Sequence, residues 1–156
     1  MKYLRWIVAI LVLSGVLKIG VGRTTFASGD CDAGCVQTVK SLIKENESGF
    51  ISGLWEKKTA RLGDRVAIAL RKIYVGKSIS KEKNIRAFLP VLKGAFEYPK
   101  LIEGAENQSP VETFKLLDEI KIKTSDKLLE TEIKRTINFI RFKTGSVDYE
   151  VLIPKS

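Results

Sequence analysis

Apolar residues recur at three- and four-residue intervals along most of this chain, and that spacing limits the fold more than any other feature. The pattern is clearest in the segment 63–74. One helical face there carries Leu62, Val66, Ala69, Leu70 and Ile73. Asp64 follows a glycine and is a suitable N-cap, because its carboxylate can accept free N–H groups of the first turn. Gly76 suits the position just after the helix.

The same spacing predicts helices before and after this segment. We expect them at 33–47, at 49–58, from Ser80 to about residue 97, from Ser109 to about Thr124, and from Ser125 to Gly145. Ser80 and Ser125 are expected as N-caps, and Pro90 is expected to kink its helix. Ser109, Pro110 and Glu112 form a capping-box pattern with proline at the first helical position.

These elements predict an all-α fold with a single helical domain over residues 28–145. Two arrangements remain open, a stack of antiparallel helical hairpins (a short α-solenoid) and an irregular helical bundle. The alternation of apolar and polar residues after Gly145 predicts an extended C-terminal tail at residues 146–156. We expect this tail to lie along the helices; the alternative is that it adds a strand to the sheet of a partner.

The first 27 residues have the layout of a secretory signal peptide. Lys2 and Arg5 precede the apolar run Trp6–Leu17, and small residues surround Ala27, the expected cleavage site. The run has 12 residues, too few to cross a bilayer of roughly 30 Å as a helix. The alternative is an uncleaved amphipathic anchor, because Lys18 and Arg23 make the segment unusually basic. The expected location is periplasmic or extracellular.

A weak internal repeat has a period near 47 residues. Ala69, Leu70 and Ile73 align with Leu116, Leu117 and Ile120 at an offset of 47. Three residues of the following helix, Ile85, Leu89 and Leu92, align with Ile133, Ile137 and Ile140 at an offset of 48. Each unit is a pair of amphipathic helices that would bury its apolar faces by stacking on the next pair.

Two segments of this repeat resemble the HEAT-like (armadillo-type) helical-repeat family, over about residues 50–142. The segment 65–73, which follows Asp64, resembles the second helix of such a repeat, and the segment 88–92, with its Pro90, resembles the kinked first helix. The second unit departs from the pattern, because Pro110 and Glu112 stand near the place that the Asp64–Arg65 pair has in the first unit. The resemblance implies stacked hairpins and a protein-binding role.

Catalytic chemistry finds no support in the composition. The chain has no histidine, which removes the usual general base and the commonest metal ligand. The neighbouring acids Asp118 and Glu119, and likewise Glu130 and Glu132, point in different directions on a helix and are expected to be solvated. Nucleotide-binding glycine patterns are absent as well. We therefore expect no enzyme, no catalytic residues, no cofactor and no resident metal.

Cys31 and Cys35 are the only cysteines, and in an oxidising compartment we expect them to form a disulfide. Helical geometry at both positions would suit the bond poorly, so the residues between them are predicted to form a turn. Two alternatives stay open: a two-thiolate copper(I) site, and a thiol-redox pair with one residue more than the usual spacing.

Positive charge is concentrated in the middle of the chain. Residues 57–100 carry 12 cations and 3 anions, whereas residues 28–56 carry 2 and 5 and residues 101–156 carry 9 and 10. The predicted partner-binding stripe consists of Lys57, Arg61, Arg65, Lys72, Lys81, Lys83 and Arg86. A positive field of this kind attracts an anionic partner. The alternative is that these residues form a solvated lysine-rich face with no binding role.

Nucleic acid fits poorly as that partner, because Tyr74 is the only aromatic residue between Lys57 and Arg86 that could stack on bases. The sequence favours an exported, non-enzymatic binding module for an acidic protein. One alternative is an envelope immunity or inhibitor protein that neutralises a toxin. Another is a structural protein at an anionic membrane surface or polymer.

Overall fold

The computed structural model describes residues 30–50, 54–97 and 109–145, and all regular structure in these ranges is helical. The elements are α2 (Ala33–Glu47), α3 (Trp55–Leu62), α4 (Arg65–Ile73), the 3-10 helix η1 (Gly76–Ser80), α5 (Glu82–Gly94), α6 (Val111–Lys123) and α7 (Lys127–Lys143). The all-α prediction is confirmed. The predicted signal peptide 1–27 and tail 146–156 lie outside the described residues. No helix in these ranges is both long and apolar enough to cross a membrane.

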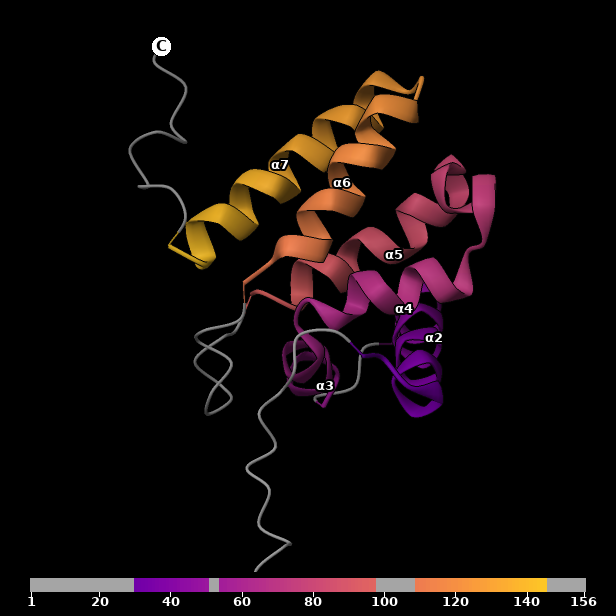
Figure 1. The fold of residues 1–156 in the computed structure, drawn as a ribbon, viewed down its shortest axis with the longest axis vertical. Helices are drawn as coiled ribbons and strands as arrows, with labels where there is room; N and C mark the ends of the chain where they lie inside the picture. The colour runs from indigo at the N-terminus through magenta and orange to yellow at the C-terminus, as the bar shows by residue number, and fades with distance from the viewer. Residues whose placement is uncertain (1–29, 51–53, 98–108, 146–156) are drawn as a thin grey trace, which may run out of the picture.

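The helices form layers of antiparallel pairs (Figure 1). The pair α4 and α5 is joined through η1, and the pair α6 and α7 lies beside it with its turn at the same end. Helix α4 packs on α6 and α5 packs on α7, while α2 packs across both α4 and α5. The stacked pairs are the same segments that align in the sequence repeat.

A constant register relates the two hairpins. The carboxylate of Asp64, before α4, accepts hydrogen bonds from the backbone N–H groups of Glu112 and Thr113 at 2.8 and 2.7 Å. Two turns further along, Arg71 Nη1 lies 2.7 Å from Glu119 Oε2. Each pair of contacts joins residues 48 or 49 positions apart, so α4 and α6 run parallel and in step.

A continuous apolar core runs through the layers. Five helices, α2, α4, α5, α6 and α7, contribute its fully buried large side chains. These are Val39, Leu42, Leu70, Ile85, Phe88, Leu92, Leu116, Leu117, Ile120, Leu129, Ile133 and Ile140. Leu116 and Leu117 are adjacent in α6, and both are fully buried. Helix α6 is sandwiched between α4 and α7, so it buries a wider face than one apolar stripe provides.

Helix α3 is held against α2 and α5 by Trp55. The indole N–H donates to the carbonyl of Leu42 at 3.2 Å. Gly94 lies against the ring, and a Cβ added to Gly94 would come within 2.8 Å of two Trp55 ring atoms. The close approach explains why the last residue of α5 is a glycine. Pro90 also lies inside this helix, which continues through it to Gly94.

Several predicted caps are wrong. Asp64 stands at the N-cap position of α4, as predicted, but its carboxylate bonds to α6 instead of α4. Helix α6 begins at Val111 with no side-chain cap from Ser109, and Pro110 is its N-cap residue rather than its first helical residue. Helix α7 is capped by Asp126, which accepts from Leu128 and Leu129, rather than by Ser125. Helix α5 has no side-chain cap at all, so Ser80 does not serve this role.

Candidate functional site

The predicted disulfide is present, and it lies at the start of α2. The Cα atoms of Cys31 and Cys35 are 5.2 Å apart and their sulfurs are bonded. Asp32 is the N-cap, with its carboxylate 2.8 Å from the backbone N of Cys35. Helix α2 therefore starts at Ala33, earlier than the predicted turn allows, and the bond forms because Cys31 stands outside the helix.

The disulfide is part of the packed interior. Cys31 has no exposed surface, and the ammonium of Lys72 donates to its backbone carbonyl at 2.6 Å. Among the residues the structure describes, no group of histidines, cysteines and carboxylates is arranged to hold a metal ion. The disulfide ties Cys31 to α2, the Lys72 hydrogen bond ties it to α4, and neither cysteine is free.

The residues of the predicted cationic stripe do not form one continuous surface in the structure. Lys57 and Arg61 are exposed on the outer side of α3, and Lys81 and Lys83 are exposed at the start of α5. None of these four side chains forms an ion pair within the described ranges.

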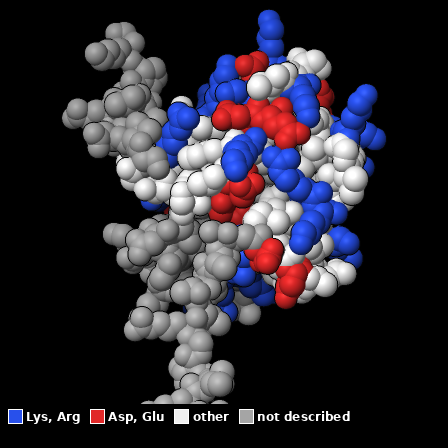
Figure 2. All heavy atoms as spheres, in the orientation of Figure 1, with Lys and Arg blue, Asp and Glu red and all other residues white. Residues whose placement is uncertain are grey.

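The other members of the stripe have intramolecular partners. Arg65 donates to the backbone carbonyl of Arg61 at 2.8 Å and to that of Leu62 at 3.4 Å, and so covers the end of α3. Lys72 is held by the carbonyl of Cys31. Figure 2 shows cations and carboxylates interspersed on the face in view, so the charge there is mixed.

Arg86 connects the stripe to a hollow between α5 and α7. Its Nη2 lies 2.5 Å from Asp126 Oδ2, and its Nη1 lies 3.4 Å from Glu132 Oε2. The pKa of Asp126 is held below its usual value, first by the N–H of Leu129 and also by the guanidinium of Arg86. Arg86 therefore sits between α5 and the start of α7 with a fixed direction.

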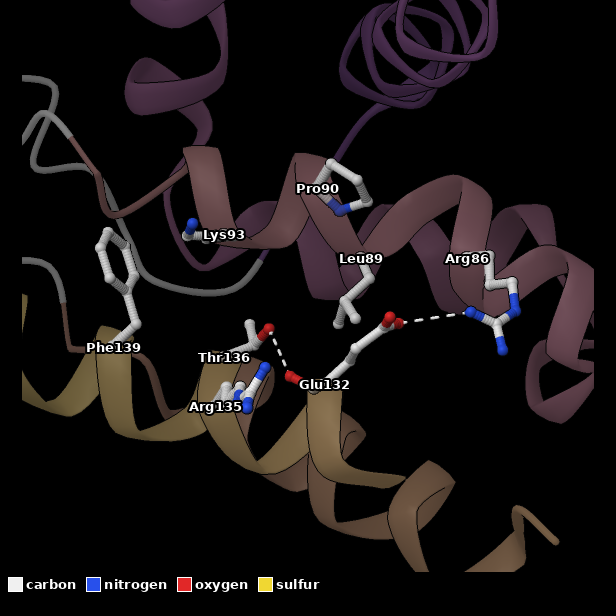
Figure 3. A pocket seen from close by; sticks show the side chains of 8 residues that line it. All are labelled: Arg86, Leu89, Pro90, Lys93, Glu132, Arg135, Thr136 and Phe139. Carbon is white, nitrogen blue, oxygen red and sulfur yellow. Dashed lines mark hydrogen bonds and ion pairs between the residues drawn. The ribbon is translucent and has the colours of Figure 1, made fainter. Parts of the chain in front are cut away.

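The hollow is an open groove of about 630 Å³ between these two helices, which we call the α5–α7 groove (Figure 3). Eight residues line it: Arg86, Leu89, Pro90, Lys93, Glu132, Arg135, Thr136 and Phe139. The first four belong to α5 and the others to α7. In Figure 3 the Leu89 side chain points toward α7, between the two ends of the groove.

The floor of the groove is largely apolar and its rim is cationic. Leu89 and Thr136 are buried, and the Thr136 hydroxyl is satisfied by the carbonyl of Glu132 at 2.9 Å. Three cations, Arg86, Lys93 and Arg135, face one carboxylate, Glu132. The groove therefore presents a net positive rim above an apolar floor.

Phe139 is surrounded by positive charge. The ammonium of Lys93 lies 4.7 Å from the centroid of its ring, and that of Lys143 lies 5.5 Å away. These distances suit cation–π attraction, which draws both ammonium groups to one end of the groove. Arg135, by contrast, is exposed and makes no hydrogen bond or ion pair with the residues described here.

Sequence reasoning singled out Arg86 but missed Lys93, Arg135 and Phe139. A usable signal was present: the α5 lining residues are spaced by three, one and three, and the α7 residues by three, one and three as well. Both sets therefore mark one helical face. What the spacing alone did not reveal is that the two faces meet across a groove.

The lining of the α5–α7 groove is cationic and apolar. It carries no histidine or cysteine, and its one carboxylate is already paired with Arg86. Comparisons of the chain with protein-family models, with curated proteins and with solved structures find no match.

Proposed function

We propose that this protein is an exported, non-enzymatic binding module that contacts an acidic protein partner. The observation that supports it best is the α5–α7 groove, where three cations and an apolar floor face solvent and Arg135 has no partner among the described residues. Guanidinium groups at such a rim suit carboxylate recognition, because each presents several N–H donors in a fixed plane.

Stacked hairpins suit such a role. A layered helical core is rigid, and it holds side chains of separate helices at fixed spacing on one surface. The resemblance to HEAT-like repeats, which serve as binding scaffolds, is part of this proposal. Export is also part of it, supported by the signal-like segment 1–27 and by a disulfide, a bond that oxidising compartments favour.

The proposed contact surface has two parts. One is the groove itself. The other is the exposed pair Lys81 and Lys83, at the N-cap and in the first turn of α5, the helix that also carries Arg86. Lys57 and Arg61 on α3 extend the positive field. Arg65 and Lys72 contribute to it less, because their donors are engaged by backbone carbonyls.

Charge reversal tests the proposal without touching those structural cations. The variant Lys81→Glu/Lys83→Glu is compared with the matched variant Lys40→Glu/Lys44→Glu, which reverses two exposed cations on α2. Immobilised full-chain protein is incubated with an extract of secreted and envelope proteins over a salt series. We expect saturable capture of an acidic protein that weakens with salt, is lost in the α5 variant and persists in the α2 variant.

Two results would overturn the proposal. One is the absence of any saturable protein partner, and the other is equal loss of capture in both variants, which would indicate a general effect of net charge. A parallel measurement uses vesicles with anionic lipid headgroups. Binding to vesicles in preference to protein would favour a membrane-surface role in its place.

A further inference from the structure

We infer that the α5–α7 groove binds a short, extended acidic peptide that carries an apolar side chain between two carboxylates. This inference rests on the proposed function and specifies which part of the partner is recognised. Three observations support it: the length of the groove, the order of apolar and cationic side chains along it, and the position of Glu132.

The dimensions favour an extended chain. Arg86 and Lys93 are seven residues apart on α5, which corresponds to about 10.5 Å along a helix axis. Three or four extended residues cover that distance at about 3.3 Å each. A helix would need about seven residues to cover the same distance at 1.5 Å each, so an extended chain spans it with the shorter peptide.

The order of side chains sets the peptide's pattern. Arg86 stands at one end, and the ammonium groups of Lys93 and Lys143 gather around Phe139 at the other. Leu89 lies between them on the floor. One ligand carboxylate would meet Arg86. The other would meet Lys93 or the guanidinium of Arg135, which lies one turn before Phe139 on α7, and an apolar side chain between the two carboxylates would cover Leu89 and the Phe139 ring.

Glu132 acts as an internal competitor for this site. Its carboxylate is 49% exposed and holds Arg86 only at 3.4 Å, whereas Asp126 holds the same guanidinium at 2.5 Å. A ligand carboxylate would take the place of Glu132 on Arg86 while Asp126 keeps the guanidinium oriented. Removing the charge of Glu132 should therefore strengthen binding, an effect that partial unfolding cannot imitate.

The test uses defined probes and the full chain. Fluorescein-labelled six-residue peptides contain two glutamates separated by one, two or three residues with leucine between them, and each has a glutamine counterpart. Fluorescence anisotropy gives the affinity. We expect at least one glutamate peptide to bind about a hundredfold tighter than its glutamine counterpart, since each of its two charge-assisted bonds contributes about tenfold.

Variants assign the binding to the groove. Arg135→Glu should weaken the best peptide about tenfold, and Glu132→Gln should strengthen it several-fold. Lys40→Glu on α2 has the same charge change as Arg135→Glu and should leave the affinity within about twofold. Glu130→Gln is the matched control for Glu132→Gln. Glu130 is two residues before Glu132, pairs with Lys134 and is not one of the residues that line the groove.

The inference is wrong if no glutamate peptide binds better than its glutamine counterpart. It is also wrong if Arg135→Glu and Glu132→Gln leave the affinity unchanged, or change it no more than their controls do. Its failure is separate from that of the proposed function. Capture of an acidic protein that depends on Lys81 and Lys83, without binding of these peptides, would leave the function standing and remove the groove as the peptide site.

Discussion

The carboxylate of Asp64 accepts the backbone N–H of Thr113 at 2.7 Å, so a residue that precedes α4 caps α6 in the next hairpin. A second bond, from the N–H of Glu112 at 2.8 Å, satisfies another free donor of the same turn. The first N–H groups of a helix have no partner within it, and here the neighbouring layer supplies one. The cap is therefore also a link between hairpins.

Removing this carboxylate should destabilise the protein more than changing the local serine. Asp64→Ala leaves two N–H groups of α6 without their acceptor, which should cost about 1–2 kcal/mol of unfolding free energy. Ser109→Ala should cost nothing measurable, because α6 takes no side-chain cap from that serine. Urea unfolding measured by circular dichroism compares the two variants. Equal losses, or a larger loss for Ser109→Ala, would contradict the assignment.

Local patterns predicted most of the helical segments but misplaced one, because the helix expected at 49–58 is Trp55–Leu62 in the structure. Spacing placed a helix at 33–47, and α2 has those bounds. The caps were less predictable, because Asp64 has the same local signature whether it caps its own helix or a distant one. An N–H donor 48 residues away competes for the carboxylate, and only the packing of α4 on α6 decides between them.

Gly94 should tolerate alanine poorly although it lies in a helix. An added Cβ would meet the Trp55 ring at 2.8 Å, and the ring cannot easily move because its N–H is bonded to Leu42. Overpacking of this kind costs about 1–3 kcal/mol, more than alanine gains in helix propensity. Thermal unfolding should show a lower midpoint for Gly94→Ala.

Gly34→Ala is the matched control for that substitution. Its added Cβ would approach only Asp32, at an ordinary contact distance of 3.5 Å, so the unfolding midpoint should stay the same or rise slightly. If Gly94→Ala were as stable as Gly34→Ala, the packing of α3 on α5 through Trp55 would have to be looser than described.

The disulfide should contribute modestly to stability. Cys31 and Cys35 are separated by four positions, and closing so short a loop in the unfolded chain corresponds to about 2 kcal/mol. The double variant Cys31→Ala/Cys35→Ala should lose that amount in urea unfolding, and wild type in a reducing agent should lose a similar amount. No further loss is expected when the double variant is itself treated with the reducing agent.

The candidate site was harder to predict than the fold, for a physical reason. Charge density along the chain identified residues 57–100 as cationic, but linear counting does not show which cations the fold uses internally. Arg65 and Lys72 look as available in the sequence as Lys81 does, yet they bond to carbonyls. Arg135 lies outside the cationic segment and joins the site only because α7 packs beside α5.

Stability should fall in acid because three carboxyl groups have lowered pKa values in the folded chain. The pKa of Glu119 is lowered by the ammonium of Lys123 and then by the guanidinium of Arg71. The pKa of Asp126 is lowered by the N–H of Leu129 and then by the guanidinium of Arg86. The pKa of Glu130 is lowered by the ammonium of Lys134. The unfolded chain then binds more protons than the folded one once the pH drops below the ordinary values of about 4. The contribution is present above that pH and is lost as the pH falls through the folded-state values.

The unfolding midpoint measured from pH 7 to pH 2 should therefore be flat near neutrality and decline below about pH 4.3. Because these groups are partly exposed, added salt should make the decline shallower. Glu119→Gln should also reduce it, since this variant removes one of the three titrating groups and its links to Lys123 and Arg71. A midpoint that rises as the pH falls would mean that these carboxylates are not stabilised by their cationic and N–H partners in the folded protein.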